Sequence, residues 1–342
     1  MFSETTRLFN ASIGASAIAA SFELGLLDAI HEAGSMDIEA FCAERELSNY
    51  AVTSILMVLA RYEFVTVTDD KATATQGPKF EDAFKDKGYF LWLIRGYGHL
   101  LHNLASIVKD DKCTTDGIGR DGKYIAMAGR DYGGQFVDPH FTDAMAEEPF
   151  TVAADLGCGS AERLMGLARA RPEFRGVGVE VNKGAVDLAR RSIKAAGLED
   201  RLTVVHFDVK NLAYQPEFED VEVLFCFFMG HDLWPRPNCL KAFKSIRQAF
   251  PNLKRFLFSD TYRSDYPIPG DTPIFTLGFE FTHDLMGQYI PSAEEWEDLF
   301  AEAGWDFRGR RDLSIPFSAI FDLRPGANGD SDGDADGNRP KS

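Results

Sequence analysis

The sequence is poor in basic residues, and this shortage excludes two kinds of partner. It has 36 Lys and Arg against 53 Asp and Glu, which gives a formal net charge of −17. Binding to nucleic acid or to an anionic membrane depends on Lys and Arg side chains that neutralise phosphate groups. We therefore expect neither a nucleic-acid partner nor a membrane partner.

Paired cysteines and long apolar runs are missing as well. The five cysteines are scattered without a CxxC pair, which suits neither a disulfide framework nor a zinc knuckle. The N-terminal residues contain no basic segment followed by a clean apolar stretch. No run approaches the roughly 18 apolar residues of a membrane span. We expect reduced thiols and a cytoplasmic protein.

The 342 residues are enough for two domains, and the pattern changes near the middle of the chain. Residues 1–145 have the pattern of a mainly helical, winged-helix-like domain. Residues 146–324 alternate short apolar strands with amphipathic helices, which is typical of an α/β domain built on a parallel sheet. Residues 325–342 are acidic, rich in glycine and poor in apolar residues, so we expect a disordered tail.

The N-terminal pattern predicts three short helices followed by a β-hairpin. Apolar residues recur at helical spacing over residues 11–64, and Ser35 and Ser48 are the N-cap candidates for the second and third helices. Two β-branched runs within residues 64–75 flank an acidic turn, which indicates the hairpin. Residues 115–136 are rich in glycine and are predicted to form a loop or a broken helix.

The second domain is predicted to contain seven strands and one well-defined helix. The helix spans residues 182–196, is followed by Gly197 as a C′ residue, and is expected to bury Val186 and Leu188 on one face. The predicted strands are 151–156, 176–181, 202–208, 221–229, 255–260, 305–311 and 317–323.

The first of these strands runs into a glycine-containing turn with the sequence VAADLGCGSA at residues 152–161. A turn between a strand and a helix is the place where an α/β sheet lets a ligand approach backbone N–H groups. Gly157 and Gly159 lack the Cβ atoms that would block this approach. We therefore expect a ligand at this turn.

Acidic residues stand at the ends of three successive strands. Asp155 precedes the glycines, Glu180 ends the second strand, and Asp208 follows Phe207 at the end of the third. A carboxylate in the position of Glu180 can accept hydrogen bonds from both ribose hydroxyls, and Phe207 with Asp208 suits an adenine and its exocyclic amine. The alternative is that the three carboxylates are ordinary caps.

This pattern favours S-adenosylmethionine over a dinucleotide. Glu162 holds the last position of a GxGxxG motif, and Asp155 stands where dinucleotide folds need an apolar residue. A carboxylate there suits a sulfonium and an amino group. The region resembles the first motif of class I methyltransferases, roughly DxGxGxG, with Ala161 in place of the third glycine. That resemblance implies a Rossmann-like, mostly parallel sheet with an antiparallel last strand and S-adenosylmethionine as cofactor.

Two histidines follow strand ends in the second half of the chain. The fourth strand ends in Met229-Gly230-His231-Asp232, so His231 and Asp232 are expected to point at the methyl acceptor. His283 comes 52 residues after His231 and also follows a strand end on the same edge. The two imidazoles can therefore meet in space. The simpler alternatives are a capping or packing role for His231 and a helix-terminal or surface position for His283.

The N-terminal helices and hairpin, the segment GHDLW and the segment DLMGQYIPSAEEW resemble small-molecule O-methyltransferases with an N-terminal dimerisation domain. In that family the histidine of a similar segment is the general base, and His231 matches it. One branch, the α-keto acid β-C-methyltransferases typified by phenylpyruvate C3-methyltransferases, resembles the chain over nearly its whole length. This resemblance implies a homodimer and a non-haem iron, or another metal such as zinc, held by His231 and His283. It also implies that Asp232 lies beside the metal and that Trp92 and Arg120 line the substrate pocket.

The resemblance implies methyl transfer from S-adenosylmethionine to C3 of a 2-oxo acid of the phenylpyruvate or 4-methyl-2-oxopentanoate type, through a metal-chelated enolate. The product would serve the biosynthesis of a β-methyl amino acid for a natural product such as an antibiotic. The alternative is metal-free O-methylation of a phenolic or hydroxylated metabolite, with His231 as general base and no need of His283. A winged-helix regulator is disfavoured, because the predicted helix 48–61 carries one basic residue. A domain that binds the cofactor without catalysis is a further alternative. His231 and Asp232 count against it, because such a domain needs no base beside the cofactor.

Overall fold

The computed structural model describes residues 3–109, 119–264 and 272–326. The chain divides into two compact units, Met1–Pro139 with Pro273–Gly287, and His140–Thr272 with Gln288–Ser342. The sequence pattern predicts the division at residue 145 and places residues 273–287 in the second domain. These residues belong instead to the first unit, because the helix they contain packs its aromatic side chains against that unit. The predicted tail lies outside the described residues from 327 onward.

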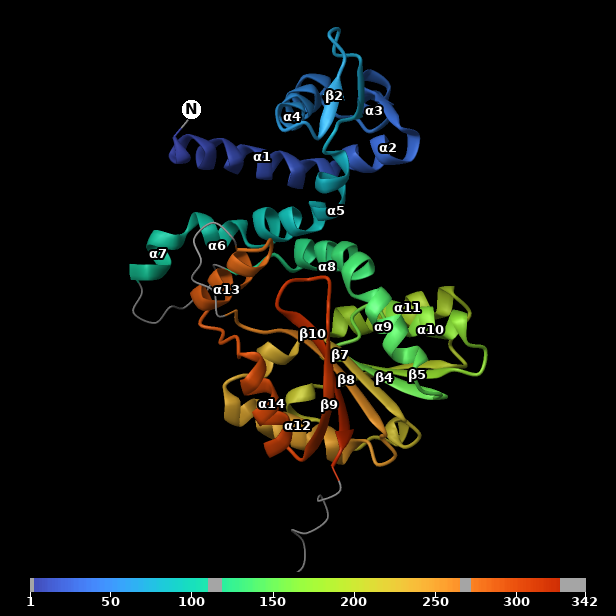
Figure 1. Ribbon diagram of the computed structural model, residues 1–342. Helices are drawn as coiled ribbons and strands as arrows, with labels where there is room; N and C mark the ends of the chain where they lie inside the picture. Colours follow the sequence, from blue (N-terminus) through green and yellow to red (C-terminus); the bar gives the residue numbers. More distant parts are fainter. Residues whose placement is uncertain (1–2, 110–118, 265–271, 327–342) are drawn as a thin grey trace, which may run out of the picture. The chain divides into compact units, whose positions relative to one another are not determined.

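The first unit is mainly helical and contains one small sheet (Figure 1). The sheet has the order β1-β3-β2, and both strand pairs are antiparallel. The hairpin predicted from residues 64–75 is therefore confirmed. The elements of this unit are α1 (Glu4–Leu24), α2 (Leu26–Ala33), β1 (Ser35–Asp37), α3 (Ile38–Glu44), α4 (Asn49–Arg61), β2 (Val65–Val67), β3 (Thr73–Gln76), α5 (Phe80–Leu91), the π-helical turn η1 (Trp92–Gly96), α6 (Gly98–His102), α7 (Leu104–Lys109), α8 (Gly122–Phe136) and α13 (Thr276–Leu285).

One of the two predicted N-caps is correct. Ser48 caps α4 by accepting a hydrogen bond from the backbone N–H of Ala51. The prediction for Ser35 is wrong, because Ser35 begins strand β1 and Asp37 caps α3 instead. A strand of three residues leaves almost no periodic signal, and tertiary pairing with β3 decides its structure.

The segment 115–136 is predicted as a loop or broken helix, but its residues Gly122–Phe136 form the regular helix α8, while residues 115–118 lie outside the described part of the chain. Asp121 caps this helix by accepting a hydrogen bond from the backbone N–H of Lys123 at 2.9 Å. Ala128 and Phe136 are buried on its inner face. Burial of this face and the cap outweigh the helix-weakening effect of the glycines, which costs about 1 kcal/mol each.

The second unit is built on a seven-stranded sheet with the order β6-β5-β4-β7-β8-β10-β9. All neighbouring strands are parallel except β10, which runs antiparallel to both β8 and β9. The seven predicted strands and the antiparallel last strand are therefore confirmed. The strands are β4 (Val152–Leu156), β5 (Arg175–Glu180), β6 (Leu202–His206), β7 (Val223–Phe227), β8 (Arg255–Thr261), β9 (Trp305–Asp312) and β10 (Ser318–Pro325).

Helices cover both faces of this sheet, with α10 and α11 on one side and α12 and α14 on the other (Figure 1). The predicted helix 182–196 is α11, which Asn182 caps and which Gly197 follows with φ 65°. Val186 is buried as expected, whereas Leu188 is 45% exposed. The helices of this unit are α10 (Glu162–Ala170), α11 (Lys183–Ala195), α12 (Arg236–Ala249) and α14 (Ala293–Glu302), while α9 (Asp138–Ala146) spans the boundary between the units.

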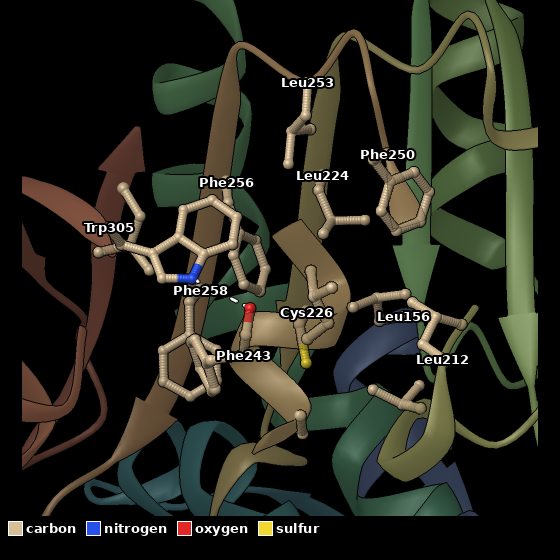
Figure 2. Packing of buried hydrophobic residues seen from close by; sticks show 14 of the residues in the cluster. Leu156, Leu212, Leu224, Cys226, Phe243, Phe250, Leu253, Phe256, Phe258 and Trp305 are labelled. Carbon is tan, nitrogen blue, oxygen red and sulfur yellow. Dashed lines mark hydrogen bonds between the residues drawn. The ribbon is translucent and has the colours of Figure 1, made fainter. Parts of the chain in front are cut away.

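A buried hydrophobic cluster lies between the sheet and the helix α12 (Figure 2). Phe243 of α12 packs against Phe256 and Phe258 of β8, with ring centres 5.9 and 5.2 Å apart. The indole nitrogen of Trp305 donates a hydrogen bond to the carbonyl of Phe243 at 3.2 Å. Each fully buried ring of this kind contributes roughly 1.5–3 kcal/mol to stability, so the cluster holds α12 against β8.

Among the described helices, none alone has both the length and the apolar composition needed to cross a membrane. The helices α1 and α2, which meet at a bend of 69°, reach that length and composition only when they are taken together.

Candidate active site

The turn after β4 takes the left-handed conformation at three positions. Gly157 has φ 75°, Gly159 has φ 53° and Ala161 has φ 63°. Gly157 donates its backbone N–H to the carbonyl of Val179 on β5 at 2.8 Å, which holds the turn against the neighbouring strand. Ala161 keeps the turn that the family motif forms with glycine, although this conformation costs a non-glycine residue about 1–2 kcal/mol.

Glu180 joins this turn to the end of β5. One oxygen of its carboxylate accepts a hydrogen bond from the backbone N–H of Gly159 at 3.0 Å, and the other accepts one from the N–H of Asn182 at 2.8 Å. A carboxylate oxygen can accept two hydrogen bonds. The carboxylate is therefore fixed in orientation and keeps the capacity to accept further donors.

Asp155 is a buried carboxyl group near the end of β4, with 4% of its surface exposed. The pKa of Asp155 is raised to about 7, mainly by burial; the positive charge of Arg163 opposes this rise and the charge of Glu180 adds to it. The ionised form is thus destabilised in the protein alone. A cation bound beside Asp155 would stabilise that form.

Phe207 and Asp208 follow β6. Asp208 caps the short 3₁₀ helix Val209–Asn211 by accepting a hydrogen bond from the backbone N–H of Lys210 at 2.9 Å. Phe207 donates its N–H to the carbonyl of Glu180 at 3.0 Å, and its ring is partly buried. One carboxylate oxygen of Asp208 therefore has the capping role that is the alternative prediction for the three strand-end carboxylates.

His231 lies in the short 3₁₀ helix η4 (Gly230–Leu233), directly after β7. Asp260 of β8 holds it twice: one carboxylate oxygen lies 2.7 Å from Nδ1 of the imidazole, and the other accepts the backbone N–H of His231 at 2.8 Å. Both side chains are buried. Since Nδ1 is engaged by the carboxylate, the chemistry of this ring is directed to Nε2.

The approach of Asp260 depends on glycine at position 230. A Cβ atom at that position would lie 2.2 Å from the ring of Phe258 and 2.7 Å from a carboxylate oxygen of Asp260. Asp260 is not among the site residues predicted from the sequence. A carboxylate at the end of the strand next to the histidine's strand is the signal that could have identified it.

Asp232 is held by the side chain of Gln288, which is also not among the site residues predicted from the sequence. The side-chain amide of Gln288 donates a hydrogen bond to a carboxylate oxygen of Asp232. Gln288 is the first residue of the second unit after the segment Pro273–Gly287. Its distance in sequence from Asp232 gives no hint of this contact.

His283, Trp92 and Arg120 belong to the first unit. His283 is buried on α13, where its Nδ1 lies 2.7 Å from the carbonyl oxygen of Phe279 one turn earlier. Trp92 is buried at the start of the π-helical turn η1, and Arg120 is exposed just before α8. Within residues 3–109, 119–264 and 272–326, no three or more His, Cys, Asp or Glu side chains are grouped to hold a metal ion.

Comparison with known proteins assigns the family. Residues 153–251 match the model of a methyltransferase domain. Over 327 residues the chain is 36% identical to the methyltransferase UngE′ of Aspergillus campestris, in a match that covers 92% of this chain and 95% of that protein. The chain belongs to the class I S-adenosylmethionine-dependent methyltransferases. It is also 26% identical, over 94% of each chain, to an indolepyruvate C-methyltransferase of Streptomyces griseus.

Solved structures share the fold along nearly the whole chain. PigF, solved with S-adenosylhomocysteine, has a TM-score of 0.67 and 17% identity, and the match covers 94% of this chain and 100% of PigF. The mitomycin 7-O-methyltransferase MmcR has a TM-score of 0.64 and 17% identity over 94% of this chain and 97% of MmcR. The Rossmann-like fold with an N-terminal helical part is therefore that of this class of methyltransferases.

Proposed function

We propose that this methyltransferase transfers a methyl group to C3 of a 2-oxo acid, of the phenylpyruvate, indolepyruvate or 4-methyl-2-oxopentanoate type. The observation that carries the proposal is the set of hydrogen bonds that the Nδ1 atoms of the two histidines make. Nδ1 of His231 is engaged by the Asp260 carboxylate and Nδ1 of His283 by a backbone carbonyl. The relative named as an indolepyruvate C-methyltransferase supports the same chemistry. The product would enter the biosynthesis of a β-methyl amino acid.

The cofactor is assigned to the turn after β4 and the neighbouring strand ends. Gly157 and Gly159 let the methionine part approach the backbone. Asp155 faces the positive sulfonium and amino groups, and Glu180 accepts the ribose hydroxyls. Phe207 and Asp208 receive the adenine.

The hydrogen bonds of the two Nδ1 atoms are compatible with a role of both histidines as metal ligands. A metal-ligating histidine usually donates its other ring nitrogen to a carboxylate or a backbone carbonyl, as His231 and His283 do. We assign a non-haem iron, or another metal such as zinc, to these two residues. When bound, this ion stabilises the developing enolate as a Lewis acid, without a redox change.

The remaining site residues act on the acceptor. Asp232, oriented by Gln288, takes the proton from C3, and Arg120 pairs with the substrate carboxylate as a bidentate donor. Trp92 contacts the substrate side chain. The C3 carbon then uses the electron pair of the broken C–H bond to attack the methyl carbon in line, while the methyl–sulfur bond breaks. Alignment of these two carbons is the main contribution of the site.

A second candidate is O-methylation of a phenolic or hydroxylated metabolite. The pair formed by His231 and Asp260 favours it, because a carboxylate on Nδ1 is also the arrangement of a general base. This reaction needs no metal and no role for His283.

Metal content and turnover, measured on the same samples, separate the two candidates. Elemental analysis of the wild type, His231→Ala and His283→Ala is combined with methyl transfer to phenylpyruvate, indolepyruvate and 4-methyl-2-oxopentanoate. We expect about one metal ion per chain in the wild type, and loss of both metal and activity in both variants. The exposed His99 provides a matched control, since His99→Ala should retain both. Unchanged activity of His283→Ala would refute the proposal and direct the search to phenolic acceptors.

We further propose that the chain is a homodimer in which α1 contributes to the interface. Leu8 and Phe9 of this helix are each 72% exposed, and Ile13 is 50% exposed. Exposed apolar side chains gathered on one helix are typical of a covered surface. A monomeric mass in light scattering would contradict this assignment.

A further inference from the structure

An aromatic cluster in the first unit contains a buried hydroxyl group that has no hydrogen bond. The cluster consists of Tyr89, Trp92, Tyr132, Phe136, Phe275 and Phe279. Tyr89 is 5% exposed, and its ring packs on Tyr132, Phe136 and Phe275 with ring centres 5.4–5.5 Å away. Within the part of the chain that the structure describes, its hydroxyl oxygen has no hydrogen-bond partner.

A second hydroxyl of the same kind belongs to the residue that follows Phe275 of this cluster in the chain. Thr276 follows Phe275 directly, is 3% exposed, and its Oγ1 likewise has no partner among the described residues. Buried polar groups without hydrogen bonds are rare in native proteins, and each one calls for an explanation such as a bound ligand or water. An unpartnered hydroxyl within the cluster, and another on the residue next to it in the chain, point to a polar group that binds there.

The backbone of this cluster is unusual at two further places. Phe275 has φ 76° and ψ −46°, a positive-φ conformation that is rare for an aromatic residue. Trp92 begins the π-helical turn η1, in which the N–H of Tyr97 bonds to the carbonyl of Trp92. Strained residues and π-helical turns are both concentrated at functional sites. His283 adjoins the same rings, because its imidazole lies 4.1 Å from the ring centre of Phe279.

We propose that Tyr89 and Thr276 determine specificity by binding a hydrogen-bonding group on the aromatic ring of the acceptor. A phenolic hydroxyl accepts a hydrogen bond from an indole N–H or donates one to a phenol oxygen, and the surrounding rings favour a flat aromatic partner. The preferred acceptor is therefore an indole-bearing or phenol-bearing 2-oxo acid, and an unsubstituted phenyl ring leaves both hydroxyls unsatisfied. This inference rests on the proposed function for the class of acceptor.

Binding is the first readout of this proposal, because it does not require turnover. Dissociation constants of indolepyruvate and phenylpyruvate are measured by calorimetry without S-adenosylmethionine, for the wild type, Tyr89→Phe and Thr276→Val. We expect the wild type to bind indolepyruvate at least about 10-fold more tightly. Tyr89→Phe should lose most of this preference, because its affinity for indolepyruvate falls while its affinity for phenylpyruvate is unchanged. Tyr50→Phe is the matched control, since Tyr50 is 85% exposed.

The ratio of kcat/KM for the same two acceptors is the second readout. It should fall in Tyr89→Phe in parallel with the binding ratio, and the thermal midpoint should not fall, because the removed hydroxyl makes no hydrogen bond. A preference that Tyr89→Phe leaves unchanged would overturn this inference even if both acids are methylated. If neither acid is methylated but the binding preference depends on Tyr89, the proposed reaction fails and the specificity role stands.

Discussion

Two buried carboxyl groups of the same sheet, Asp155 and Asp260, are stabilised in different ways. Asp260 is 0% exposed and accepts hydrogen bonds from the backbone N–H groups of His231 and Thr261 and pairs with the imidazole of His231. Among the residues that the structure describes, no such set of hydrogen bonds holds the buried Asp155, and its ionised form is opposed by burial and by Glu180. Hydrogen bonds within the protein thus hold the carboxylate at β8, whereas the raised pKa of Asp155 at β4 leaves its ionised form to be stabilised by a cation, as we propose for the cofactor.

This difference separates two tasks within one active site. A carboxylate that is satisfied by its own chain can fix a neighbouring imidazole, and it needs no ligand to do so. A carboxyl group with a raised pKa responds to the charge of what binds next to it. We therefore interpret the end of β8 as the positioning part of the site and the turn after β4 as its cofactor-sensing part.

The largest expected effect is that of Asp260→Asn. The amide cannot accept both hydrogen bonds from His231 in the same way, so the ring loses its fixed orientation. We expect kcat/KM to fall about 100-fold, the upper end of the usual cost of changing such an outer partner. Steady-state kinetics and circular dichroism check this, with the exposed carboxylate Asp312 as control in Asp312→Asn. Wild-type activity in a folded Asp260→Asn variant would show that the pair does not position the ring.

The next effect is a pH dependence of cofactor binding that arises from Asp155. Its pKa of about 7 means that the cofactor-free protein is mostly protonated there at pH 6. Since positively charged S-adenosylmethionine favours the ionised form, its dissociation constant should fall roughly eightfold between pH 6 and pH 7.5. Calorimetry measures this change. In Asp155→Asn the dependence should disappear, and an equal slope in this variant would assign the titration to another group.

The raised pKa of Asp155 also makes the stability of the cofactor-free protein depend on pH. The unfolded chain loses the Asp155 proton near pH 3.9, whereas the folded chain keeps it until about pH 7. The folded state therefore binds more protons across this interval. The stabilisation from this group is complete below about pH 4 and is lost as the pH rises through 7.

The smallest expected effect is that of Ala161→Gly in the turn after β4. Glycine would relieve a left-handed conformation that costs alanine about 1–2 kcal/mol. It would also remove a fully buried methyl group worth about 0.8 kcal/mol and add about 0.5–1 kcal/mol of unfolded-state entropy. The opposing terms nearly cancel, so the free energy of unfolding in urea should change by less than about 1 kcal/mol. A larger loss would mean that the methyl group packs more tightly than these terms allow.

Much of the second unit could be predicted from the sequence, because its signals are local. All seven strands, the helix capped by Asn182 and the turn at Gly157 depend on hydrophobic alternation, capping chemistry and glycine, which act over a few residues. The first unit was less predictable. Strand β1 is short and exists through its pairing with β3, and α8 forms in spite of its glycines because its inner face is buried.

Some residues of the candidate site could likewise be predicted from local signals in the sequence, and others could not. Strand ends brought Asp155, Glu180, Asp208 and His231 to attention, since the carboxyl ends of parallel strands line one edge of a sheet. The partners that orient these groups were not found. Gln288 reaches Asp232 from 56 residues away in sequence, and Asp260 reaches His231 from 29 residues away. Neither separation corresponds to a repeating pattern.

The sequence by itself determined the class of fold, the glycine turn and the acidic and histidine positions at the strand ends, because each depends on neighbouring residues. Only the tertiary structure decided which atoms of those residues are already engaged. It joined Asp260 to His231, raised the pKa of Asp155 through burial, and enclosed the Tyr89 hydroxyl among aromatic rings. Hydrogen-bond partners and desolvation are properties of a surrounding shell, and that shell is assembled from segments far apart in the chain.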